Sequence, residues 1–145
     1  MSIENYNVNN EGRCAEKLDL LKGEIFKTAI ELLKNNGTEE KGFMWLRYQV
    51  FRFSDESEKP IVTMEMKAGN NLERAGRVKF TIKGMDPFFV SKSGPEGQES
   101  YYAKRLNREG FFHDAYPDEI IGYRNTLRKI KTQVNFNKIK DMLSE

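Results

Sequence analysis

The spacing of apolar residues changes twice along this chain, and these changes constrain its fold most strongly. Between residues 18 and 33, apolar side chains recur at steps of three and four, which is the period of one face of an α-helix. Between residues 43 and 83 the period shortens to two, as in β-strands. From residue 120 to residue 134 the helical spacing returns. The order of periods therefore predicts a helix, then a sheet, then further helices.

These periods predict a single α+β domain of two layers. We expect an N-terminal helix from about residue 13, a three- to four-stranded antiparallel meander sheet, and two to three C-terminal helices, one of them at residues 99–108. Residues 1–12 are polar and are expected to form a disordered arm, so residues 13–145 make up the domain. The expected core comprises the inward positions of the most periodic segments: Leu21, Ile25, Leu32, Val78, Phe80, Ile82, Leu127 and Ile130.

The composition narrows the classes of protein. The 145 residues fit one domain and carry a formal net charge of +2. Cys14 is the single cysteine, so no internal disulfide forms, and the first residues lack the order of a signal peptide. No apolar run approaches the length of a membrane span. We therefore expect a cytoplasmic protein with no membrane partner, while the oligomeric state stays open.

The main candidate binding surface is a basic stretch near the C-terminus. Residues 120–140 contain no acidic residue. Arg124, Arg128 and Lys131 follow helical steps of four and three and share one face, and Lys138 and Lys140 continue the basic run. Such a face is suited to phosphates or to an acidic protein surface, although cations near a helix C-terminus also offset the helix dipole.

A second group of cations is expected on the outer face of the sheet. If Phe53 pairs across the turn near Ile61, then Lys67 lies opposite Arg47. Arg47, Lys67, Lys79 and Lys83 then share a surface with the rings of Trp45 and Phe51. Interleaved rings and cations are typical of surfaces that stack bases and contact phosphates. Alternatively, a helix covers these rings.

One triplet points to an enzyme. Glu65 and Lys67 lie two residues apart on an expected strand, so their side chains share a side, and Asp55 lies upstream. This arrangement resembles the core of the PD-(D/E)xK nuclease family, which implies a metal held by Asp55 and Glu65 with Lys67 assisting hydrolysis. A turn at residues 54–60, however, places Asp55 more than about 10 Å from Glu65. Cross-strand charge pairing on an exposed sheet face explains Glu65 and Lys67 more simply.

No other motif names a reaction. His113 is the only histidine, so we expect no multi-histidine metal site, and no cofactor-binding fingerprint is present. The residues favour a small non-enzymatic binding protein, such as a regulator or inhibitor, whose basic surface binds nucleic acid or an acidic protein. The alternatives are the metal-dependent nuclease and an immunity- or antitoxin-like protein-binding module.

Overall fold

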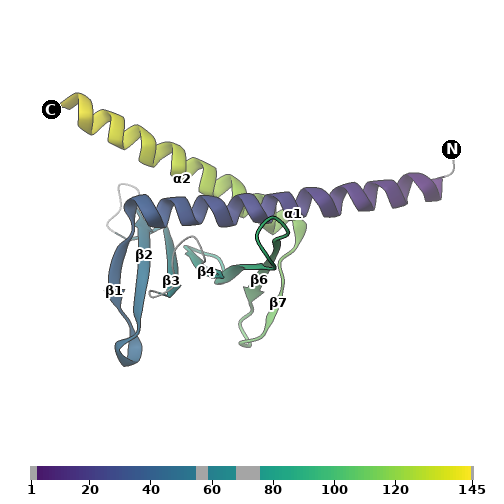
Figure 1. Ribbon diagram of the computed structural model, residues 1–145, viewed down its shortest axis with the longest axis horizontal. Helices are drawn as coiled ribbons and strands as arrows, with labels where there is room; N and C mark the ends of the chain where they lie inside the picture. The colour runs from purple at the N-terminus through teal and green to yellow at the C-terminus, as the bar shows by residue number, and fades with distance from the viewer. Residues whose placement is uncertain (1–2, 55–58, 68–75, 145) are drawn as a thin grey trace.

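The computed structural model describes residues 3–54, 59–67 and 76–144, with side chains from Glu16 onward. Two long helices, α1 (Ile3–Asn36) and α2 (Pro117–Ser144), lie on the same face of one β-sheet (Figure 1). The seven strands between them are β1 (Thr38–Lys41), β2 (Arg47–Phe53), β3 (Val62–Lys67), β4 (Arg77–Ile82), β5 (Phe88–Ser93), β6 (Ser100–Leu106) and β7 (Phe112–Asp114), and the short 3-10 helix η1 (Phe43–Trp45) joins β1 to β2.

The sheet is a meander in which each strand pairs with the next one along the chain. The strand order is β1-β2-β3-β4-β5-β6-β7, and every neighbouring pair is antiparallel. The hairpins at the two edges, β1–β2 and β6–β7, both extend away from the helices (Figure 1). Neither of the described long helices contains an apolar stretch of the length that a membrane span requires.

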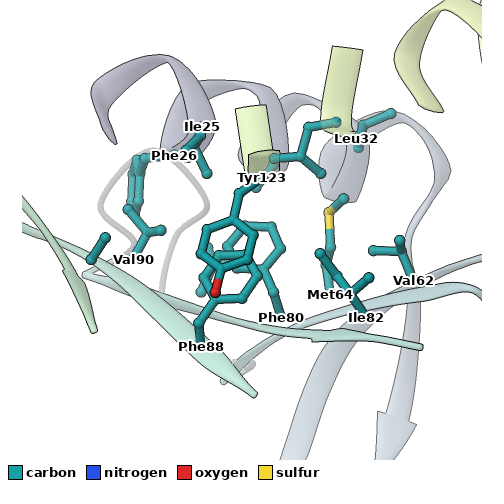
Figure 2. Packing of buried hydrophobic residues seen from close by; sticks show 14 of the residues in the cluster. Ile25, Phe26, Leu32, Val62, Met64, Phe80, Ile82, Phe88, Val90 and Tyr123 are labelled. Atoms are coloured by element: carbon teal, nitrogen blue, oxygen red, sulfur yellow. The ribbon is translucent and has the colours of Figure 1, made fainter. Parts of the chain in front are cut away.

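The core lies between the helices and one face of the sheet. On β3 the residues Val62, Met64 and Met66 are buried, while the residues between them are partly exposed. The same alternation continues on β4, and Ile25 and Leu32 of α1 cover these side chains from above (Figure 2). Seven of the eight residues expected in the core belong to this cluster, and Leu21 packs against it partly buried.

Three stacked rings connect α2 to the middle of the sheet. The ring of Phe80 on β4 stacks on Phe88 on β5 at a centroid distance of 4.6 Å, and Phe88 stacks on Tyr123 of α2 at 3.6 Å (Figure 2). All three side chains are fully buried. Gly23 of α1 leaves room for the ring of Tyr101 on β6. A Cβ atom at residue 23 would lie 3.1 Å from this ring.

The expected three- to four-stranded sheet is wrong, because the sheet has seven strands. Residues 99–108 were expected to form a helix but contain β6, in which Tyr101 and Ala103 face the helices and Tyr102 and Lys104 do not. The helix prediction rested on Tyr102 and Leu106, which lie four residues apart. In the structure the side chains of this segment instead alternate between the two faces of the sheet, as in a strand. The edge strand β1 escaped prediction because its sequence, Thr-Glu-Glu-Lys, is almost entirely charged.

The expected two to three C-terminal helices are also wrong, because α2 is one continuous helix. The helical spacing recognised in the sequence ends at Val134, and a separate helix was expected after it. No glycine or proline lies between Val134 and Phe136, so nothing in the sequence ends the helix there. At the other end of the chain, α1 begins at Ile3, ahead of the start near Arg13 that the apolar spacing predicts.

We expect Phe80→Ala to lower the free energy of unfolding by about 3–5 kcal/mol, because it removes the central ring of the buried stack and leaves a cavity. Chemical denaturation measures this change. The matched control is Thr81→Ala at the next, exposed position, where we expect a change within about 0.5 kcal/mol. Equal stability of the two variants would contradict the assignment of the buried face.

Tyr123 is expected to make stability depend on alkaline pH. Burial, and then the nearby Glu119 carboxylate, raise the pKa of the Tyr123 hydroxyl above its ordinary value. Between the ordinary pKa of about 10 and the raised folded value, the unfolded chain loses this proton and the folded chain keeps it. The free energy of unfolding should therefore fall as the pH rises above about 10, and fall less in Tyr123→Phe. Tyr116→Phe, at an exposed tyrosine, should retain the parental profile.

Candidate binding surface on the open face of the sheet

The face of the sheet opposite the helices is not covered by any described element, and we call it the open face. Residues that pair across neighbouring strands share a face, so the registers define its members. Glu65 pairs with Lys79, Lys79 with Phe89, and Phe89 with Lys104. Its other members include Tyr48 and Arg52 on β2, Lys67 on β3, Arg77 on β4, Ser91 on β5, Tyr102 on β6, and Phe112 and Asp114 on β7.

Two adjoining hollows lie on this face. The first has a volume of about 400 Å³ and is lined by Arg77, Phe89, Ser91, Tyr102, Lys104 and Phe112. The second, of about 490 Å³, is lined by Tyr48, Glu65, Lys67, Gly76, Arg77, Lys79 and Phe89. Both are open to solvent, and Arg77 and Phe89 line both of them. The two hollows therefore form one continuous shallow surface across β2 to β7.

Arg77 and Phe89 form the centre of this surface. The guanidinium carbon of Arg77 lies 5.3 Å from the centroid of the Phe89 ring, and its Nε donates to Ser91 Oγ at 3.4 Å. The ring of Phe89 meets that of Phe112 edge to face, with 5.1 Å between centroids. Tyr102 and Phe112 remain 50% and 52% exposed, so both rings are accessible to a ligand.

The charge of the open face is predominantly positive. Its described strand residues include five cations and three acids: Arg52, Lys67, Arg77, Lys79 and Lys104 against Glu40, Glu65 and Asp114. Glu40 forms an ion pair with Arg52 at the β1–β2 edge. Of the cations around the two hollows, Lys79 lies opposite Glu65 and Lys104 opposite Asp114, while Arg77 lies opposite Ser91 and Lys67 opposite Tyr48.

The register of β2 against β3 differs from the expected one by a single residue. Phe53 pairs with Val62 rather than with Ile61, so Lys67 lies opposite Tyr48. A shift of one residue moves every side chain of a strand to the other face. Lys67 and Lys79 consequently lie on the open face, whereas Arg47 and Phe51 belong to the face of the helices.

The other two members of that expected group lie outside the strands. Lys83 lies in the turn after β4, where its backbone N–H donates to the carbonyl of Ile61. Trp45 lies at the tip of the β1–β2 hairpin. Neither residue lines the two hollows.

The basic face of α2 lies against acidic residues of α1. Arg128 Nε donates to Glu24 Oε1 at 2.7 Å, and Lys131 Nζ donates to Glu31 Oε2 at 3.0 Å. Arg124 lies 4.0 Å from the same Glu24 carboxylate. These three cations join the two helices. Lys138 and Lys140 lie further along α2, where both are exposed.

The candidate nuclease residues are brought together only in part. Glu65 and Lys67 share the open face and line the same hollow. Asp55 lies outside the described residues, so its distance from Glu65 is not tested. In the described part of the chain, no group of three or more histidine, cysteine, aspartate or glutamate residues is positioned to hold a metal ion.

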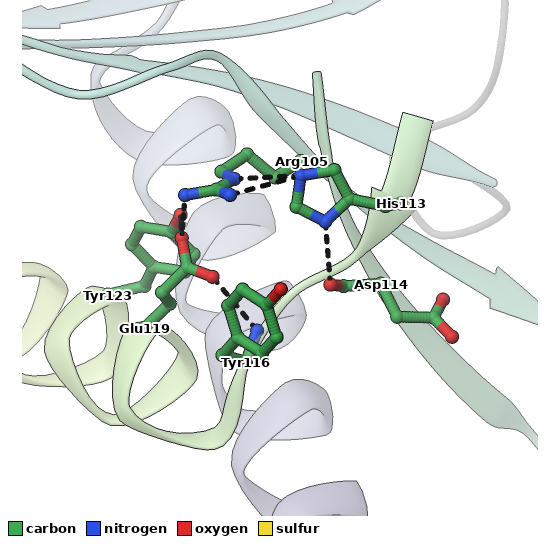
Figure 3. Close-up of polar contacts among 6 residues, drawn as sticks. All are labelled: Arg105, His113, Asp114, Tyr116, Glu119 and Tyr123. Atoms are coloured by element: carbon green, nitrogen blue, oxygen red, sulfur yellow. Dashed lines mark hydrogen bonds and ion pairs between the residues drawn. The ribbon is translucent and has the colours of Figure 1, made fainter. Parts of the chain in front are cut away.

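His113 belongs to a polar cluster where β6, β7 and the start of α2 meet (Figure 3). Its Nε2 lies 3.1 Å from both Nε and Nη2 of Arg105. Because arginine is always protonated, Nε2 accepts, and Nδ1 carries the proton and donates to the Asp114 backbone carbonyl at 3.1 Å. Arg105 also donates to Glu119 at 2.9 Å. The contacts of His113 therefore join β7 to Arg105 of β6, while the Asp114 carboxylate points away from the imidazole ring (Figure 3).

Sequence reasoning missed most residues of this surface, among them Arg77, Phe89, Tyr102, Lys104 and Phe112. For Arg77 the signal was present, because its strand was recognised and its side chain was placed outward. Phe89 follows Phe88, and only the registers decide which of the two rings is buried. Tyr102 lies in the segment expected to be helical, and no strand was expected around Phe112, so neither residue was placed in the predicted sheet.

No family model matches the chain, and neither a curated protein nor a solved structure matches it.

We expect the ion pair between α2 and α1 to contribute modestly to stability. Arg128→Glu places two carboxylates together at Glu24 and should lower the free energy of unfolding by about 0.5–1 kcal/mol. The double charge swap Arg128→Glu with Glu24→Arg should recover part of this loss, as measured by urea denaturation. Lys140→Glu, at an exposed position of α2, serves as the control. Equal stability of Arg128→Glu and this control would show that the pair contributes nothing.

Proposed function

We propose that the protein is a non-enzymatic binding protein whose open face binds single-stranded nucleic acid. The observation that carries this proposal is the combination of Arg77, Phe89, Tyr102 and Phe112 around one shallow hollow, on a sheet face that no described element covers. A single strand exposes base faces and phosphates. Aromatic rings can stack on the base faces, and neighbouring cations can contact the phosphates.

The rings support binding to unpaired bases. Tyr102 and Phe112 are half exposed on neighbouring strands, and Phe89 joins them in lining the hollow. A base has a free face for stacking only when it is not enclosed in a duplex. Each stacking contact is typically worth about 1–3 kcal/mol. A shallow surface open to solvent therefore favours a single strand over a duplex.

The cations around the hollows support contacts to phosphates. Lys67 and Lys79 line the second hollow, Lys104 lines the first, and Arg77 lies between them. This arrangement favours the open face over the basic face of α2, whose Arg128 and Lys131 are engaged by Glu24 and Glu31. An acidic protein partner would use the same cations without needing the exposed rings, so the rings decide between the two classes of partner.

Binding to labelled single strands of about 12 nucleotides, DNA and RNA, tests the proposal by fluorescence anisotropy. Four phosphate contacts to a single strand predict a slope of about −2.8 in log K against log salt. Lys79→Glu with Lys104→Glu should weaken binding by roughly 100-fold, because each reversal replaces an attraction with a repulsion. The matched control, Lys138→Glu with Lys140→Glu, changes the net charge equally on α2 and should bind as the parent does.

Removal of a ring tests the stacking contribution separately. Tyr102→Ala should weaken single-strand binding by about 1–3 kcal/mol, whereas Phe136→Ala, at a similarly exposed ring on α2, should not. Equal binding of a duplex of the same length, unaffected by Tyr102→Ala, would overturn the single-strand proposal. A larger loss in the α2 double reversal than in the sheet double reversal would show that the binding surface lies on α2.

A further inference from the structure

The tip of the β1–β2 hairpin exposes four consecutive apolar residues, Phe43, Met44, Trp45 and Leu46, which we call the hairpin tip. Phe43, Met44 and Trp45 are 84%, 74% and 82% exposed, and Leu46 is also exposed. The hairpin extends from the sheet away from both helices (Figure 1). Runs of exposed apolar residues of this length are avoided in soluble domains unless they serve a function.

The backbone of the hairpin tip adopts a conformation that its residues disfavour. Met44 has φ 56° and ψ 38°, and Trp45 has φ 63°, so both lie in the left-handed region that glycine and asparagine occupy most readily. Hairpin turns usually place Asn-Gly at such positions. The turn is closed by two hydrogen bonds, from Gly42 N–H to the Leu46 carbonyl at 2.6 Å and from Leu46 N–H to the Phe43 carbonyl at 3.3 Å. Large apolar side chains thus occupy positions where the backbone conformation favours glycine or asparagine.

Two cations lie opposite each other at the base of the hairpin tip. Lys41 pairs with Arg47 in the register of β1 and β2, and like charges in this position destabilise a sheet. The Lys41 ammonium lies 5.6 Å from the Trp45 ring centroid. The acids next along β1 both contact arginines, since Glu39 pairs with Arg47 and Glu40 with Arg52.

We infer that the hairpin tip inserts into the surface of an anionic lipid bilayer. Consecutive residues around a tight turn point to different sides, so an apolar medium that surrounds the tip buries all four side chains at once. Tryptophan favours the boundary between headgroups and acyl chains. Lys41, which lies beside the Trp45 ring, is then at the depth of the headgroups, where a cation is attracted by anionic lipids.

Insertion by a hairpin tip needs no membrane-spanning segment. The expectation that the protein has no membrane partner rested on the absence of such a segment and does not bear on a short surface anchor. A base step accepts one or two inserted side chains, which leaves the rest of the hairpin tip in water. The inference is independent of the function proposed for the open face.

Trp45 provides a direct measurement, because it is the single tryptophan of the chain. We expect its fluorescence to shift to shorter wavelength on mixing with phosphatidylcholine vesicles that contain about 30% phosphatidylserine. Lipids brominated on the acyl chains should quench the emission. Pure phosphatidylcholine vesicles should give a smaller shift, and high salt should weaken binding to the anionic vesicles.

Matched variants distinguish insertion of the hairpin tip from nonspecific adhesion of the protein to the vesicles. In vesicle sedimentation, Met44→Asp should reduce the bound fraction at least severalfold, whereas Met142→Asp, at an equally exposed methionine on α2, should bind as the parent does. Lys41→Glu should reduce binding to anionic vesicles only. Circular dichroism should show that all three variants remain folded. Tyr102→Ala should keep vesicle binding whatever its effect on oligonucleotides.

Several outcomes would overturn the inference. These are an unchanged Trp45 spectrum with anionic vesicles, an equal loss of vesicle binding in Met44→Asp and Met142→Asp, or a spectral shift with oligonucleotides and none with vesicles. The last outcome would assign the hairpin tip to the nucleic-acid surface instead.

Discussion

The packing of both helices on a single face of the sheet determines the rest of the structure. Phe80, Phe88 and Tyr123 form a fully buried stack that ties the middle of the sheet to α2, and α1 covers the aliphatic side chains on either side. Because this face supplies nearly all of the buried core, the opposite face contributes little buried apolar surface to stability. Cations and half-exposed rings are tolerated there, and the proposed nucleic-acid surface is a consequence of this one-sided burial.

The buried face could be predicted from the sequence only where apolar and polar residues alternate within one strand. β4 carries Val78, Phe80 and Ile82 between charged residues, and its inward side was correctly identified. The strands at the edges are harder to recognise because their alternation is masked by charge or by aromatic residues on both sides. β1 is mostly charged and β7 is three residues long, so neither carries a periodic signal. Their place in the sheet is fixed by pairing with β2 and β6, which a local pattern does not contain.

The structure places the two predicted basic surfaces, on the sheet and on α2, differently from what the sequence suggested. The cations of the sheet were partly recovered, since Lys67 and Lys79 do share a face, but the register was misjudged by one residue and moved Arg47 to the other side. The basic run of α2 has no acid within its own sequence. Its partners, Glu24 and Glu31, lie about a hundred residues earlier on α1. A local count of charge therefore overstated how far these cations are available to a partner.

The open face and the hairpin tip are joined through one side chain. The Tyr48 ring lies so close to Gly42 that a Cβ atom there would come within 2.3 Å of it. A larger residue at position 42 would therefore displace the Tyr48 ring, and the Gly42 N–H closes the turn by donating to the Leu46 carbonyl. Tyr48 also lines the hollow with Lys67 and Arg77. The position of this ring is thus shared by two surfaces, and a ligand that displaced it from the hollow would also change the packing against the backbone that holds the tip.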